Sequence, residues 1–234
     1  MKEFDYVSRN LRELKEELDL IAKRVGAPSP KLVAVTKSGT DEELLALCRA
    51  GASAIGENRP GELKRRGELL MQNGLSPELH QIGTLQSNKA KLVFDKAALI
   101  HSLDSLSLAK ELNRLALRDG IYVRVLVEIN SAEETQKSGI LPSEAERFIW
   151  SLSEFERLKI SGLMTMGPAG ADDGEYRRYF SLTKQLFDKL HSQYGFGDNP
   201  TLSMGMSDSY RVAVEEGSNL VRVGRRLFMK NQED

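Results

Sequence analysis

Lys37 is the residue in this sequence with the clearest potential for covalent chemistry. It ends the apolar run LVAVTK, residues 32–37, where strand alternation places its side chain on the same face as Val33 and Val35. If that face lines the inside of a barrel, loss of hydration favours the neutral amine, which can form a Schiff base with an aldehyde. The alternative is a lysine at the end of a strand whose amine simply reaches solvent.

The segment SMGMSD, residues 203–208, has the composition of a phosphate site. It joins a short apolar run to a predicted helix start, where free N–H groups attract anions. Gly205 allows the backbone to approach a ligand closely, and the hydroxyls of Ser203 and Ser207 can donate hydrogen bonds. The alternative is an ordinary helix cap formed by Ser207 or Asp208.

A second candidate for phosphate binding is RVGR, residues 222–225, which follows the last apolar run. Gly224 exposes backbone N–H groups, and Arg222 can reach a ring nitrogen or a phosphate. In barrels built from alternating strands and helices, the loops after strands seven and eight commonly bind phosphate. The alternative for Arg222 is a structural salt bridge.

A reactive lysine and a separate phosphate site together describe a ligand with an aldehyde at one end and a phosphate at the other. Pyridoxal 5′-phosphate fits this description. Asn58, which follows the second apolar run, could bond a substituent of the ring or form a turn. We interpret His80 as a packed, hydrogen-bonded residue and the basic run 64–66 as an exposed helix face.

The elements that must position these residues alternate along the chain. An amphipathic helix comes first, with apolar residues every three or four positions between residues 4 and 25. Further helices are predicted to begin at a capping box on Thr40, near Ser87, at Asp104 and at Pro142. The predicted strands cover residues 32–37, 52–56, 79–83, 97–101, 121–130, 158–164, 201–203 and 219–223. Eight such units predict an α/β fold, a (β/α)₈ TIM barrel preceded by an extra helix, with an open doubly wound sheet as the alternative.

The composition excludes several classes of protein. The chain has 33 Lys and Arg against 34 Asp and Glu, which is not the basic footprint of a nucleic-acid-binding protein. Its single cysteine, Cys48, forms no intramolecular disulfide, and its three histidines are too widely spaced to predict a metal site. The charged start and the absence of long apolar runs predict neither a signal peptide nor a membrane helix. We therefore expect one domain over residues 1–234 in a monomeric cytoplasmic protein.

Several motifs, taken in order, are familiar. They are VAVTK at 33–37, IGENRPGE at 55–62, HQIGTLQSNK at 80–89, KSGI at 137–140, SGLMTMG at 161–167 and LSMGMSDSYRVAVEEGSNLVRVG at 202–224. This order and spacing resembles the pyridoxal phosphate homeostasis protein family over nearly the whole chain. That family is similar to the N-terminal barrel of alanine racemase without its second, β-rich domain.

The resemblance implies a set of residues that bind pyridoxal 5′-phosphate. They are Lys37, Asn58, Ser203, Ser207, Arg222, Gly224 and Arg225. Lys37 would carry the Schiff base, and Ser207, Gly224 and the amide of Arg225 would hold the phosphate, with help from Ser203. Arg222 would face the pyridine nitrogen and keep it unprotonated, which makes the cofactor a poorer electron sink. The family pattern has a threonine where this chain has Arg225 and a tyrosine where it has Arg59.

The implied function is to hold pyridoxal phosphate, to buffer its free aldehyde and to deliver it to apoenzymes that depend on it. Two enzyme classes are alternatives. A single-domain amino-acid racemase needs an acid or base on each face of the substrate carbon, and no second domain is expected beyond Asp234 to supply one. A Schiff-base aldolase acting on a phosphosugar needs no cofactor, so a colourless protein would favour it.

Overall fold

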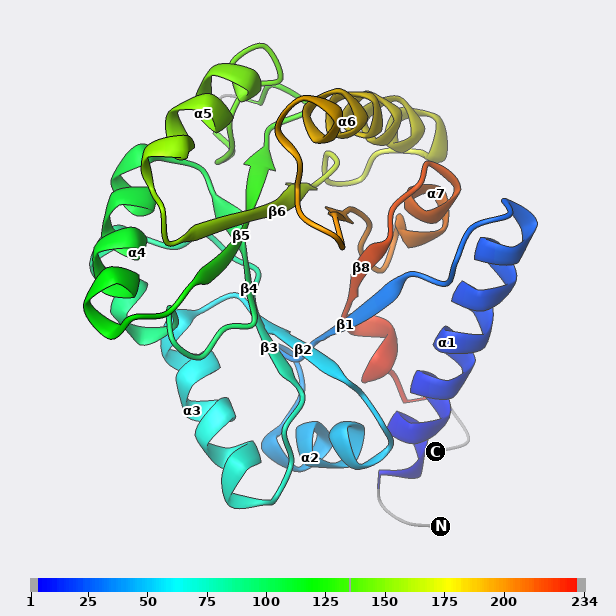
Figure 1. Cartoon of the computed structure of the whole chain (residues 1–234). Coiled ribbons are helices and arrows are strands. Elements are labelled where there is room, and N and C mark those ends of the chain that lie inside the picture. Colours follow the sequence, from blue (N-terminus) through cyan, green and yellow to red (C-terminus); the bar gives the residue numbers. More distant parts are fainter. Residues whose placement is uncertain (1–3, 135, 231–234) are drawn as a thin grey trace.

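Eight parallel strands close into a barrel in the computed structural model, which describes residues 4–134 and 136–230 (Figure 1). Each strand pairs with the next along the chain, and β8 closes the ring by pairing with β1. The strands are β1 (Lys31–Val35), β2 (Ala54–Glu57), β3 (Glu78–Gln81), β4 (Leu99–Leu103), β5 (Val123–Ile129), β6 (Leu158–Thr165), β7 (Thr201–Ser203) and β8 (Leu220–Val223). The closed ring confirms the barrel and rules out the open sheet. Asp234 lies outside the described residues.

Helices cover the outside of the barrel (Figure 1). The α-helices are α1 (Asp5–Arg24), α2 (Asp41–Arg49), α3 (Pro60–Gln72), α4 (Leu106–Asp119), α5 (Ala145–Ser151), α6 (Asp173–Tyr194) and α7 (Tyr210–Glu215). Three short 3₁₀ helices complete the set: η1 (Ser87–Leu92), η2 (Leu152–Glu154) and η3 (Arg225–Leu227). No helix in the described part of the chain is both long and apolar enough to cross a bilayer.

The inside of the barrel holds one apolar cluster and several buried polar side chains. The apolar cluster consists of Val33, Val35, Ala54, Ile82, Leu99, Leu126, Met164 and Leu220, from strands on all sides of the ring. The valine face of β1 therefore points inward, which is the orientation that the sequence left open. Because alternate residues share a face, Leu99, Leu126 and Leu220 bring His101, Glu128 and Arg222 to the same interior.

Helix α1 braces the elements that follow β7 and β8. Its apolar stripe packs in one cluster with Val221 and Val223 of β8. On its polar side, Glu17 accepts hydrogen bonds from the Tyr210 hydroxyl at 2.8 Å and from Arg211 Nε at 2.5 Å, both on α7. The extra N-terminal helix predicted from the sequence therefore supports the segments that we considered for phosphate binding.

The predicted strands are all present, and their ends differ from the structure by at most two residues. The predicted helix near Ser87 is the 3₁₀ helix η1, and the one predicted from Pro142 begins three residues later at Ala145. The capping box at Thr40 is confirmed, since its hydroxyl accepts from Glu43 N and the Glu43 carboxylate accepts from Thr40 N. The predicted cap at Asp104 is wrong, because Ser105 Oγ accepts from Leu108 N instead.

Candidate functional site

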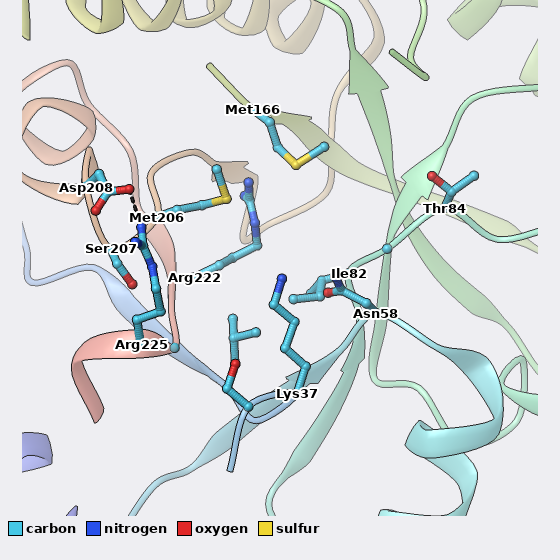
Figure 2. Close-up of a pocket in the computed structure, with 14 residues that line it drawn as sticks. Lys37, Asn58, Ile82, Thr84, Met166, Met206, Ser207, Asp208, Arg222 and Arg225 are labelled. Carbon is cyan, nitrogen blue, oxygen red and sulfur yellow. Dashed lines mark hydrogen bonds and ion pairs between the residues drawn. The ribbon is translucent and has the colours of Figure 1, made fainter. Parts of the chain in front are cut away.

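A cavity of about 520 Å³ opens at the carboxyl ends of the strands. Its lining includes these predicted site residues: Lys37, Asn58, Ser207, Arg222, Gly224 and Arg225. Figure 2 shows the amine of Lys37 extending into the space between Arg222 and Asn58, with Ser207 and Arg225 on one side. Six predicted site residues from four separate segments of the sequence therefore meet at one mouth of the barrel.

Lys37 lies in a turn just beyond β1 and not in the strand itself, which ends at Val35. The side chain is exposed to the cavity, so the predicted desolvation of the amine is wrong for the structure as described. The alternative of a lysine that reaches toward solvent is the better description of its surroundings. The turn fixes the position from which the Lys37 side chain extends across the barrel mouth.

A buried arginine holds the turn that carries Lys37. Arg66 of α3 donates to the carbonyl oxygens of Thr36 and of Gly39, the latter at 2.7 Å, and pairs with Glu57 Oε1 at 2.6 Å. The same carboxylate oxygen accepts from the Thr36 hydroxyl. The prediction that residues 64–66 form an exposed face is therefore wrong for Arg66, because its charge is needed beneath the lysine turn.

The loop between β7 and α7 contributes Ser207 and Asp208 to the cavity lining. Met206 O accepts from Ser209 N and Tyr210 N, and Met206 N donates to Ser209 Oγ, so the helix begins at Tyr210. The predicted cap at Ser207 or Asp208 is wrong, because both residues lie in the turn before the helix. Within the described residues, the N–H groups of Ser207 and Asp208 donate no hydrogen bond to the protein.

Gly224 and Arg225 provide a second pair of backbone donors, after β8. Neither N–H has an acceptor within residues 4–134 and 136–230. A Cβ on Gly224 would lie 2.8 Å from Val35 O, so only glycine fits where β8 passes β1. The Arg225 side chain forms an ion pair with Asp208 at the rim, as the dashed line in Figure 2 marks. Four unpaired N–H groups thus belong to two segments that line the same cavity.

Gly205 is required for the shape of the first of these segments, which leads to a testable prediction. Its φ is +92°, and an added Cβ would lie 2.6 Å from Ala213 Cβ and 2.9 Å from Tyr210 Cα. Gly205→Ala is therefore expected to lower the free energy of unfolding, measured in urea, by about 2–4 kcal/mol through backbone strain and overpacking. Gly170→Ala is the matched control, because Gly170 has φ +74° but open space around it. Equal losses in the two variants would show that close packing at Gly205 is not needed.

Arg222 is almost fully buried below the cavity and is held by backbone and hydroxyl oxygens. Nη1 donates to Ser203 O at 2.9 Å and to Ser203 Oγ at 2.5 Å, and Nη2 donates to Thr165 O at 3.0 Å. These bonds use three of its five N–H donors and leave Nε–H and one Nη2–H for a ligand. Burial lowers the pKa of Arg222 to about 10, with nearby Glu128 opposing the shift, so the side chain stays cationic at neutral pH.

Ser203 does not line the cavity, which differs from its predicted role in holding phosphate. It is fully buried, and its hydroxyl contacts Arg222 and His101 Nδ1, the latter at 3.1 Å. His80 is buried and hydrogen-bonded, as predicted. The predicted alternative of a carboxylate salt bridge for Arg222 is also wrong, because its hydrogen-bonding partners are neutral oxygens.

Several lining residues were not among the predicted ligand contacts, although Met206 and Asp208 belong to the segment 203–208 that we considered for phosphate. They are Val35, Ser38, Ile82, Gly83, Thr84, Met166, Met206 and Asp208. Met166 follows β6 and Met206 belongs to the loop before α7, and Figure 2 shows their thioethers on either side of the end of the Arg222 side chain in this view. The only sequence signal for Met166 and Met206 was their position after predicted strands. A single methionine at such a position carries no pattern that shows whether it lines a cavity or packs in the core.

Comparison with known proteins identifies the family. Residues 10–232 match the sequence model described as the N-terminal domain of alanine racemase. A pyridoxal phosphate homeostasis protein from Aquifex aeolicus is 34% identical over 228 residues, which are 97% of this chain and 98% of that protein. The chain belongs to the pyridoxal phosphate homeostasis protein family.

Solved structures agree with membership of the pyridoxal phosphate homeostasis protein family. PipY of Synechococcus elongatus, whose structure has pyridoxal phosphate bound, is 29% identical, with a TM-score of 0.83 over 95% of this chain and 100% of that one. Alanine racemase of Corynebacterium glutamicum has a TM-score of 0.73 at 20% identity, covering 98% of this chain and 62% of the racemase. The second likeness concerns the fold alone, and it agrees with the predicted racemase-like barrel.

Proposed function

We propose that this protein binds pyridoxal 5′-phosphate at the barrel mouth and serves in the intracellular balance of that cofactor. The observation that carries the proposal is that one cavity joins a lysine amine, four unpaired backbone N–H groups and a buried arginine with free donors. The family name of the relatives and the ligand of PipY point to the same compound.

The residues present fit the chemistry of this cofactor. A phosphate dianion needs several N–H donors, and the segments at Ser207–Asp208 and Gly224–Arg225 offer four that have no acceptor in the described protein. The close approach of Gly224 to Val35 leaves no room for a side chain over the second pair. The cavity of about 520 Å³ is also within the range of small-molecule sites.

The residues at the barrel mouth have different roles in holding the ligand. When bound, pyridoxal 5′-phosphate supplies an aldehyde with which a lysine amine can condense, releasing water. Lys37 supplies the amine, Ser207 with the backbone of Gly224 and Arg225 holds the phosphate, and Arg222 donates to the pyridine nitrogen. Asn58 contacts a ring substituent from the opposite wall. Ser203 acts beneath the site, through Arg222.

We further propose that the protein is a carrier without catalytic turnover, acting as a monomer in the cytoplasm and passing the cofactor to apoenzymes. The relatives are named homeostasis proteins rather than enzymes. The carrier role also suits an exposed lysine amine, because an accessible covalent link can be exchanged with another amine. The amino-acid racemase is the second candidate, favoured only by the racemase-like fold.

Borohydride trapping tests the proposal. Protein incubated with pyridoxal 5′-phosphate should become yellow, and reduction followed by peptide mass mapping should place the pyridoxyl group on Lys37. Pyridoxal without phosphate is the matched probe, and it should label Lys37 far less because it lacks the group that the four N–H donors hold. Labelling spread over exposed lysines, with Lys37 unmodified, would contradict the assignment.

A further inference from the structure

A chain of buried side chains crosses the inside of the barrel and ends on Arg222. Ser203 Oγ lies 2.5 Å from Arg222 Nη1 and 3.1 Å from His101 Nδ1. His101 Nε2 lies 2.9 Å from His80 Nδ1, and His80 Nε2 lies 3.4 Å from Glu78 Oε2. Ser203, His101 and His80 are each at most 1% exposed, whereas Glu78 is exposed at the opposite end of the barrel.

Hydrogen-bond chemistry gives this chain one direction. Both ends of the chain have fixed roles: the Arg222 guanidinium only donates, so Ser203 Oγ accepts from it, and the Glu78 carboxylate, whose pKa is lowered to about 2, only accepts, so His80 carries its proton on Nε2 and offers Nδ1 as an acceptor. The Ser203 hydroxyl proton is then donated to His101 Nδ1. His101 must then carry its proton on Nε2 and donate it to His80 Nδ1. Every donor in the chain therefore points away from the cavity, and both histidines are fixed as the Nε2–H tautomer.

The surroundings of the histidines keep both rings neutral. Burial lowers the pKa of His101 well below its usual value, and the positive charges of Arg222 and Lys31 act in the same direction. Burial also lowers the pKa of His80, with Glu78 opposing the shift and Lys31 and Arg124 supporting it. Neutral rings preserve the single hydrogen-bond direction at physiological pH.

We propose that His101 is a positioning residue for the cofactor: by accepting a hydrogen bond from the Ser203 hydroxyl, it keeps Ser203 Oγ turned toward Arg222 as an acceptor and fixes the guanidinium of Arg222 toward the pyridine nitrogen. Without an acceptor at His101, the Ser203 hydroxyl is free to turn and must find another acceptor among the groups around Arg222. The arginine then loses one of its three anchors. This inference rests on the proposed function, because it concerns how the same site is prepared for its ligand.

The tautomers can be measured in the unaltered protein without any cofactor. Nitrogen-15 NMR of the histidine rings at pH 7 should show His101 and His80 as neutral Nε2–H tautomers. Their signals can be assigned by their loss in His101→Asn and His80→Asn, while His191→Asn identifies the third histidine. Finding His101 protonated on Nδ1 would overturn the proposal, and this measurement does not depend on ligand binding.

A double-mutant cycle tests whether His101 acts through Ser203. His101→Leu should weaken equilibrium binding of pyridoxal 5′-phosphate by about 2–10-fold, the range for one hydrogen bond, and Ser203→Ala should weaken it similarly. In the Ser203→Ala protein, His101→Leu should have no further effect, because the route to Arg222 is already broken. Equal losses in both backgrounds would show that His101 acts through packing alone.

A conservative replacement provides the rescue. His101→Asn places an amide oxygen close to the position of Nδ1, so it restores an acceptor for Ser203, and binding should return to within about twofold of wild type. Failure of the rescue in a protein with wild-type urea unfolding would contradict the proposal. Borohydride trapping on wild-type Lys37 is carried out in parallel, so loss of the proposed function itself is recognised separately from loss of the positioning effect.

Discussion

Replacing Lys37 with alanine is expected to abolish the visible absorption band and all borohydride-stable attachment of pyridoxal 5′-phosphate. The reason is that Lys37 is the one lysine among the described residues that line the cavity. The fold should be unaffected, because the side chain is exposed and leaves the strand face intact. The free energy of unfolding in urea should change by no more than about 0.5 kcal/mol.

Two further variants separate the possible causes of such a loss. Lys37→Arg keeps the positive charge but not the nucleophilic amine, so it should retain non-covalent binding without the visible band. Lys110→Ala removes an exposed lysine on α4, away from the cavity lining, and should behave as wild type. A normal band in Lys37→Ala would mean that another lysine carries the link and would contradict the assignment.

The barrel could be predicted from the sequence because its signals are local. Apolar runs and helix periodicity report burial within a few residues, and each of the eight runs is a strand in the structure. Closure of the eight strands into a ring could not be predicted from these local signals. It depends on β8 pairing with β1, with Lys31 opposite Leu220 and Val33 opposite Arg222, across nearly the whole chain.

The candidate site was predictable where a residue type carries its own chemistry. Each of Lys37, Ser207 and Arg222 had an ordinary structural alternative, but together they described one ligand, and all three line one cavity. What could not be predicted was the support beneath them. Arg66 looked like part of a charged surface helix, yet it is buried against Glu57 because α3 packs over the lysine turn. Such a contact depends on tertiary packing rather than on local pattern.

The role of Ser203 was also beyond sequence reasoning. Ser203 and Ser207 are four residues apart in one motif and seemed equivalent. The structure separates them, because Ser203 ends β7 inside the barrel while Ser207 lies in the turn at the cavity. The strand boundary therefore decides which serine faces the ligand and which faces Arg222.

The protein with its cofactor bound is expected to show no appreciable racemisation of amino acids. Racemisation needs an acid or base on each face of the substrate carbon. Among the side chains that line the described cavity, the ionisable ones are Lys37, Asp208, Arg222 and Arg225. Asp208 and Arg225 are paired with each other, and Arg222 stays cationic because its pKa of about 10 lies well above neutrality. Lys37 therefore has no opposite partner, which should cost roughly 10²–10⁴-fold in rate.

The test is incubation of the cofactor-loaded protein with L-alanine and, separately, D-alanine in deuterated water. Chiral analysis and the mass of the α-hydrogen should show, at most, slow exchange and no sustained conversion. Lys37→Ala loaded with the same cofactor measures the background from free pyridoxal phosphate. Asp208→Asn is the informative variant, because Asp208 is the one carboxylate lining the described cavity. Sustained turnover that is lost in both variants would identify Asp208 as the missing acid or base and would establish a racemase in place of a carrier.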